Sequence, residues 1–147
     1  MTLAFRNVDV DPSDPVEDWP TEAVLTALER GGLSHWRRLA AAVNEQPWGP
    51  VARRVEAVIN AARPYGSSEL LEGVITRART RAEEQERLVV AAEITALVAA
   101  SGMTRGDFAR SVGTSASRLS TYVNGSVTPS AAMLVRMRRV VAKEACR

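Results

Sequence analysis

Cysteine and histidine are almost absent from the sequence, and their scarcity excludes several kinds of site. The one cysteine, Cys146, cannot form a disulfide within the chain, so we expect a surface thiol in a reducing compartment. The one histidine, His35, has no cysteine, aspartate or second histidine at metal-ligand spacing. We therefore expect no metal and no cofactor, with His35 partly exposed in the capping turn of a helix.

Long apolar runs and the usual catalytic motifs are missing as well. No stretch of about 20 apolar residues occurs, and the first residues lack the pattern of a secretory signal. No glycine-rich loop is followed by a phosphate-binding lysine, and the paired Glu83 and Glu84 lie in charged surface sequence. We expect a cytoplasmic protein without a membrane partner, without catalytic residues and without enzymatic activity.

Aromatic residues are few, at 5% of the 147 residues, whereas 46% are hydrophobic and 24% are charged. The abundance of alanine, arginine, glutamate, valine and leucine predicts an all-α fold with no sheet. A chain of this length forms one domain or two small ones.

The net charge is only +2, but the two halves of the sequence differ in sign. Residues 1–89 contain 11 lysines and arginines against 14 acidic residues, a net charge of −3, and residues 90–147 contain 8 against 3, a net charge of +5. This pattern favours a polyanion-binding module joined to a partner-binding or assembly domain. Chance unevenness is the alternative.

The N-terminal half is predicted to contain an acidic arm followed by short helices. Residues 1–18 show little helical periodicity, so we expect a flexible or loosely docked acidic arm. Residues 19–87 are predicted to form a helical dimerisation or partner-binding domain with a connector helix. Its first three helices are expected to begin at a capping Thr21, a capping Ser34 and at Pro50, with these residues inward: Val24, Leu25, Leu28, Trp36, Leu39, Ala40, Val43, Val51, Val55, Val58 and Ile59.

A long helical pattern then leads towards the C-terminal half. Residues 77–87 are almost all helix formers, so helix is predicted to continue through them. Residues 68–100 form either one long connector or two helices that break near Arg87. The charged face of this stretch either is solvated and laced with ion pairs or pairs two chains.

The most specific pattern lies between Thr104 and Pro129, where a tight turn separates two short helices. Thr104 is expected to cap the first helix, with Asp107 three residues later as in a capping box. Gly113 stands where a left-handed residue must end that helix, and Ser115 is expected to cap the next. The inward residues are expected to be Phe108, Ala109, Val112, Leu119, Tyr122 and Val123.

This segment resembles the Cro/C1-type (Xre) helix-turn-helix family of bacterial and phage DNA-binding regulators, over about residues 90–141. Arg105 stands where that family usually has glutamine, and Thr114 where it usually has an aliphatic residue. An ordinary helical hairpin within a bundle is the alternative. The positions in register with the family are Thr104, Arg105, Phe108, Ala109, Gly113, Ser115, Gly125 and Pro129.

Composition and helical patterns predict an all-α protein with an N-terminal helical domain and a long connecting helix. The resemblance implies a C-terminal helix-turn-helix domain at residues 88–147. It also implies double-stranded DNA as the partner, with the helix 115–124 in the major groove. Arg118 is expected to read guanine, unless it pairs with an acidic neighbour instead. Expected base contacts come from Ala116, Ser117, Arg118 and Thr121, and expected phosphate contacts from Thr104, Arg105, Ser115, Ser120 and Asn124.

Two functions fit this organisation. The first is a transcriptional regulator, a repressor, that binds its operator as a homodimer. The second is an antitoxin whose N-terminal domain binds a toxin and whose helix-turn-helix autoregulates the operon. The tryptophans Trp19, Trp36 and Trp48 all lie in the N-terminal half as core residues or interface anchors, and the core is favoured for Trp36.

Overall fold

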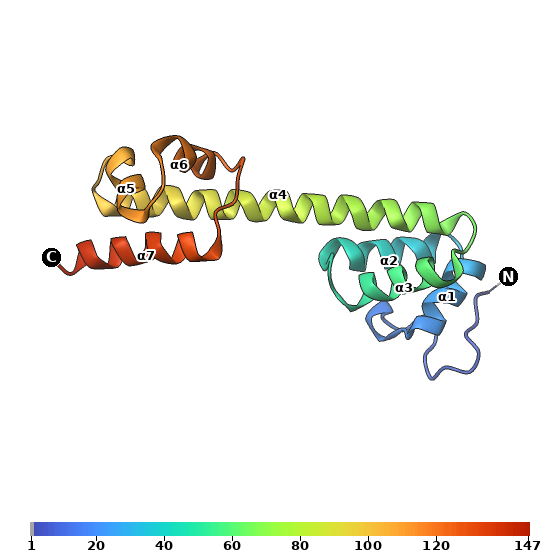
Figure 1. Cartoon of the computed structure of the whole chain (residues 1–147). Coiled ribbons are helices and arrows are strands. Elements are labelled where there is room, and N and C mark those ends of the chain that lie inside the picture. Colours follow the sequence, from blue (N-terminus) through green and yellow to red (C-terminus); the bar gives the residue numbers. More distant parts are fainter. Residues whose placement is uncertain (1) are drawn as a thin grey trace. The chain divides into compact units, whose positions relative to one another are not determined.

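The structure is a computed structural model that describes residues 2–147 (Figure 1). These residues form seven α-helices and one short 3-10 helix, and no strand occurs among them. The predicted all-α fold is confirmed. The chain divides into two compact units, one ending at Ala82 and one running from Glu83 to Arg147. The sequence had placed this boundary slightly later, between residues 87 and 88.

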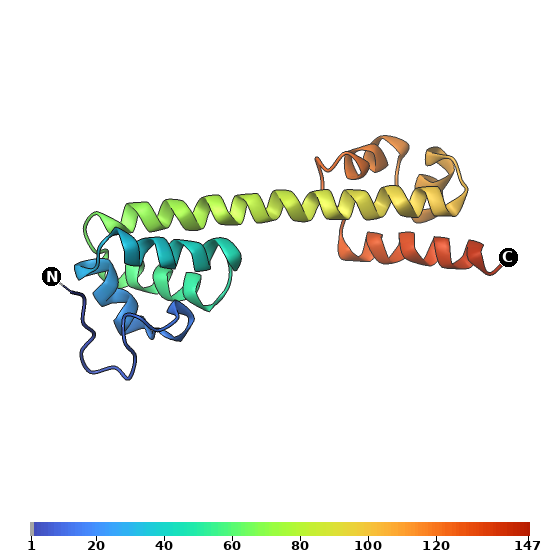
Figure 2. The same cartoon turned by 180° about the vertical axis from the view of Figure 1, so that it is seen from behind.

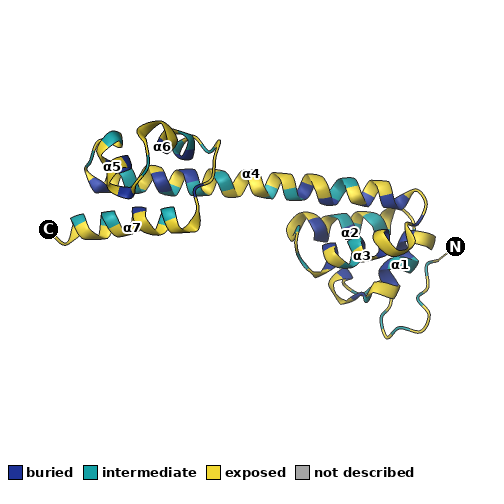
Figure 3. Ribbon diagram, in the orientation of Figure 1, coloured by how far each residue is buried: buried dark blue, intermediate teal, exposed yellow. Residues whose placement is uncertain are grey.

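Helices α1 (Thr21–Arg30), α2 (Leu33–Glu45) and α3 (Pro50–Ala62) and the first part of α4 (Ser67–Ser101) enclose the core of the N-terminal unit. Figure 3 marks the buried residues along these helices, which recur at the helical spacing that the apolar pattern predicts. Among the fully buried residues are Val24, Leu28, Leu39, Val43, Val55 and Leu71.

Two predicted helix caps in this unit are wrong. Thr21 is the first residue of α1, after Pro20 at the N-cap, and Ser34 lies inside α2, after Gly32 at the N-cap. The N–H of Gly32 donates to Nδ1 of His35 (3.1 Å), so this imidazole does lie in the capping turn as predicted. The ring accepts this bond as the N3 side chain of a capping box does, whereas a serine hydroxyl at the N-cap would accept from an N–H of the first helical turn.

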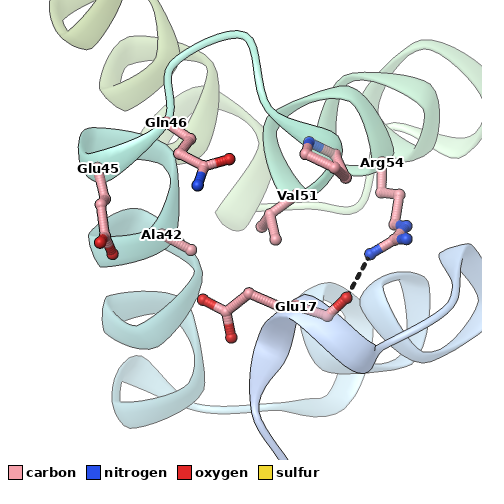
Figure 4. A pocket seen from close by; sticks show the side chains of 7 residues that line it. Glu17, Ala42, Glu45, Gln46, Val51 and Arg54 are labelled. Atoms are coloured by element: carbon pink, nitrogen blue, oxygen red, sulfur yellow. Dashed lines mark hydrogen bonds between the residues drawn. The ribbon is translucent and has the colours of Figure 1, made fainter.

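The acidic segment before Trp19 packs against the N-terminal unit, so the structure shows the docked alternative of the two that the sequence left open. Its 3-10 helix η1 (Val16–Asp18) buries Val16, and Nη1 of Arg54 donates to the carbonyl oxygen of Glu17 (2.8 Å; Figure 4). The guanidinium of Arg38 donates to two more carbonyl groups of the segment. Four apolar side chains of the segment contact the core: Leu3, Phe5, Val8 and Val10.

Trp19 lies at the centre of this packing and is fully buried. Its ring meets that of Phe5 edge to face, with 5.0 Å between centroids, and its Nε1 donates to the carbonyl oxygen of Asp14 (3.1 Å). Trp36, which the sequence favoured as the core residue, is only partly buried and packs against the core. Trp48 is 44% exposed, beneath the guanidinium of Arg79.

Helix α4 is continuous over 35 residues and does not break near Arg87. It contributes to both cores, because Leu71 and Ile75 are buried in the first unit and Ala91 and Ile94 in the second. No single helix among residues 2–147 is both long and apolar enough to cross a membrane; α4 and α5 meet that description only together, across a 104° bend.

The C-terminal unit consists of the last part of α4 with α5 (Arg105–Val112), α6 (Ala116–Val123) and α7 (Ala131–Ala145). Within this unit, Figures 1 and 2 show α6 on one side of α4 and α7 on the other. Ser130 caps α7 by accepting a hydrogen bond from the N–H of Met133 (3.1 Å). The core includes Ile94, Phe108, Ala109, Leu119 and Met137.

Candidate nucleic-acid interface

The start of α5 is fixed by Thr104, as the sequence predicts. Its Oγ1 accepts a hydrogen bond from the N–H of Asp107 (3.1 Å) and donates to Oδ2 of the same residue (2.8 Å). The capping box is therefore incomplete, because the carboxylate binds the threonine hydroxyl and not the N-cap N–H. The hydrogen bond from Thr104, with a smaller contribution from Arg110, lowers the pKa of Asp107.

The turn between α5 and α6 depends on a left-handed glycine. Gly113 has φ +82°, its N–H donates to the carbonyl oxygen of Arg110 (3.2 Å), and the N–H of Thr114 donates to that of Ala109 (2.9 Å). These two bonds are the 5→2 and 6→1 bonds of a Schellman motif. The tight turn and the fully buried Ala109 let α5 and α6 pack closely, which fixes how α6 is presented.

Helix α6 has a capped first turn and one polar face. Ser115 accepts a hydrogen bond from the N–H of Arg118 (3.1 Å), which confirms the predicted cap. Leu119 and Tyr122 hold the helix to the core. Three of the four predicted base-contacting side chains are exposed, namely Ala116, Ser117 and Arg118, and the fourth, Thr121, is partly buried.

Arg118 is held by Tyr122, which the sequence predicts only as a core residue. Its Nε donates to the hydroxyl oxygen of Tyr122 (3.1 Å), one helical turn along α6. The two terminal nitrogens of the guanidinium still point their N–H groups away from this bond and can form a bidentate contact. Among residues 2–147, Arg118 forms no ion pair, so the alternative of an acidic neighbour is not what the structure shows. The i, i+4 spacing of arginine and tyrosine was the available signal.

The other expected phosphate-contacting residues are exposed but differ in how much hydrogen-bonding capacity remains. Arg105 lies on the surface at the start of α5, and Ser120 lies on the surface of α6. Asn124 ends α6, where its Oδ1 accepts from the N–H (2.9 Å) and the hydroxyl (2.6 Å) of Ser126. The side-chain amide of Asn124 therefore keeps its NH₂ group as a donor.

Among residues 90–147, five basic side chains form no ion pair. The acidic side chains after residue 90 all lie in ion pairs: Glu93 with Arg138 (2.7 Å), Asp107 with Arg110, and Glu144 with Arg147 (3.9 Å). The hydrogen bond between Arg138 and Glu93 lowers the pKa of Glu93 and raises the pKa of Arg138. The remaining basic residues are exposed and leave the surface positive: Arg105, Arg118, Arg136, Arg139 and Lys143.

Over residues 2–147, no three histidine, cysteine, aspartate or glutamate side chains gather in a group that could hold a metal ion. Cys146 is an exposed free thiol.

Comparison with protein families identifies the C-terminal part of the chain. Residues 77–142 match the family model of a helix-turn-helix domain, a stretch that includes most of the C-terminal unit. No curated protein and no solved structure matches the chain. The capped α5, the glycine turn and the polar α6 lie inside the matched stretch. Residues 77–142 of this protein are therefore a helix-turn-helix domain, consistent with the Cro/C1 type.

Proposed function

We propose that this protein is a sequence-specific, double-stranded DNA-binding transcriptional regulator, a cytoplasmic repressor that reads the major groove with α6. The observation that carries this proposal is the exposed polar face of α6, on which Arg118 is oriented by Tyr122. A helix of this kind fits the major groove, and an arginine with two free terminal nitrogens matches O6 and N7 of guanine.

The roles follow from position on the two helices. Ala116, Ser117, Arg118 and Thr121 contact bases, with the methyl group of Ala116 against thymine. Thr104, Arg105, Ser115, Ser120 and Asn124 contact phosphates, where the N-termini of α5 and α6 add N–H donors. Because one such helix reads few base pairs, the protein binds as a homodimer to two half-sites about one helical turn apart.

The test is DNase footprinting of the full-length protein on its own promoter, followed by selection of binding sites from a random duplex library. We expect one protected region with two-fold symmetry and a selected motif that contains guanine at the position read by Arg118. A library that returns no enriched motif would contradict sequence-specific binding.

The alternative function is an antitoxin whose N-terminal unit binds a toxin. The supporting observation is that this unit has its own core and exposes large apolar side chains, namely Leu33, Trp48, Tyr65 and Leu70. Such side chains are typical anchors of protein interfaces. A toxin-like gene in the same operon favours this function, whereas a lone gene behind a palindrome favours the repressor.

A further inference from the structure

A basic groove lies between α5 and α7 in the C-terminal unit. It is lined by Ser111 from α5 and by Arg136, Arg139, Val140, Ala142 and Lys143 from α7. Its walls carry three exposed positive charges, its floor is apolar, and no carboxylate takes part in the lining. Positive charges grouped without counter-charges favour an acidic occupant.

The groove lies mainly along α7 and not along α6. Within the C-terminal unit, α6 and α7 lie on opposite sides of α4 (Figures 1 and 2), although Arg136 at one end of the groove lies next to Gly113 in the turn before α6. An apolar floor also adds little to the binding of a phosphate backbone, whereas it fits an apolar side chain between acidic ones. These observations favour a protein segment over nucleic acid.

The spacing of the groove residues defines the segment that fits. Arg136, Arg139, Val140 and Lys143 follow one another at i, i+3, i+4 and i+7, so they share one face of α7. An occupant that matches this face is a helix with acidic residues seven apart and an apolar residue between them.

Helix α1 of this same chain has that pattern. Glu22, Leu25, Thr26 and Glu29 follow one another at the same spacing, the two glutamates are exposed, and Leu25 is only partly buried. Neither glutamate forms an ion pair with any residue from 2 to 147, whereas Glu56, Glu69 and Glu72 of the same unit are already paired.

We infer that the groove between α5 and α7 binds α1 of a second copy of the chain. In this contact Glu22 and Glu29 face the three basic side chains, and Leu25 lies on the apolar floor near Val140. A two-fold dimer makes the contact twice, because each copy offers one groove and one α1, and α6 of each copy stays exposed. The inference rests on the proposed function, which requires a dimer, and names the surfaces that form it.

The test is a charge-swap series on the full-length chain, measured by sedimentation velocity over a range of concentrations. The acidic variant is E22R/E29R, and the basic variant is R136E/R139E/K143E. A third protein combines both sets. Matched controls are E45R and R53E, single charge reversals at other exposed positions of the N-terminal unit. Circular dichroism melts show that each variant folds.

We expect the acidic and the basic variant each to raise the dimer dissociation constant at least about tenfold, since like charges then meet across the contact. The combined variant should return to within about threefold of the wild type, and the controls should match the wild type. The inference is overturned if the folded single-set variants dimerise like the wild type or if the combined variant does not recover. It is also overturned if the wild type is a monomer.

A duplex-binding titration of the same variants separates this inference from the proposed function. The acidic and basic variants should keep the wild-type base preference on a single half-site, because α6 is unchanged. If R136E/R139E/K143E instead weakens half-site binding and lowers its salt dependence, the groove binds phosphates and the inference fails while the proposed function stands. If the wild type shows no base preference on any duplex, the proposed function fails.

Discussion

The hydrogen bond between Tyr122 and Arg118 can be tested directly, because its acceptor oxygen can be removed without disturbing the core. The Tyr122 ring is buried and only 5% of the residue is exposed, so Tyr122→Phe keeps the packing and deletes the acceptor of the Nε–H bond. Arg118 itself is exposed. Freed from Tyr122, its side chain must be ordered again each time the protein binds DNA.

The magnitude follows from that ordering cost. Immobilising a flexible side chain at an interface costs about 0.5–1.5 kcal/mol. Tyr122→Phe should therefore weaken binding to the cognate duplex by about 2- to 12-fold. Binding to a random duplex should be unchanged, since the phosphate contacts remain.

Fluorescence anisotropy with cognate and random duplexes measures both constants, and a double-mutant cycle isolates the cause. In an Arg118→Ala background, Tyr122→Phe should have no further effect, so that the coupling energy equals the loss caused by Tyr122→Phe alone. An equal loss in both backgrounds would refute the positioning role of Tyr122. A cognate affinity unaltered by Tyr122→Phe would refute it as well.

Three further predictions concern the same domain. Arg118→Ala should reduce the free energy of binding to the cognate duplex by about 1–3 kcal/mol and flatten the base preference at one position. Arg105→Ala should weaken binding to cognate and random duplexes alike and lower the salt slope by about one. A binding-site selection that returned the wild-type motif with Arg118→Ala would contradict the first expectation. The log-log salt dependence of wild-type binding should have a slope of roughly −4 to −5 if about five phosphates are contacted, and an anisotropy titration that showed no dependence would exclude that footprint. Gly113→Ala should lower the free energy of unfolding by about 1–2 kcal/mol, because φ is +82°. Its matched control is Gly106→Ala, where a β-carbon meets no atom within 4 Å. That control should be neutral or stabilising by up to about 1 kcal/mol, and equal urea-unfolding midpoints for the two variants would contradict the assignment of strain to Gly113.

The N-terminal segment shows what charge and composition leave open. Its aspartates and prolines predict a flexible or loosely docked arm, and the structure shows it docked, with Leu3, Phe5, Val8 and Val10 against the core. Their spacing of two residues, from 3 to 5 and from 8 to 10, is that of extended chain, but the segment forms no strand and packs as irregular chain around Trp19. The local sequence does not indicate which side chains of such a segment point towards the core.

The sequence alone determined the helix-turn-helix and most of its boundaries. Thr104, Ser115 and Ser130 cap helices through side-chain oxygens within three residues of their partners, and Gly113 adopts the left-handed conformation that the turn needs. These interactions are local, so a short stretch of residues contains all the atoms that take part. The polar face of α6 follows from helical periodicity for the same reason.

Only the tertiary structure decided which distant residues meet. It placed Trp19 and not Trp36 at the centre of the N-terminal core, and it brought Ser111 of α5 beside the basic face of α7. It also selected the rotamer that joins Arg118 to Tyr122, one of several that an arginine on a helix surface can adopt. Such contacts depend on how helices pack across the core, and packing is fixed by shape complementarity between segments far apart in the chain, which no local pattern contains.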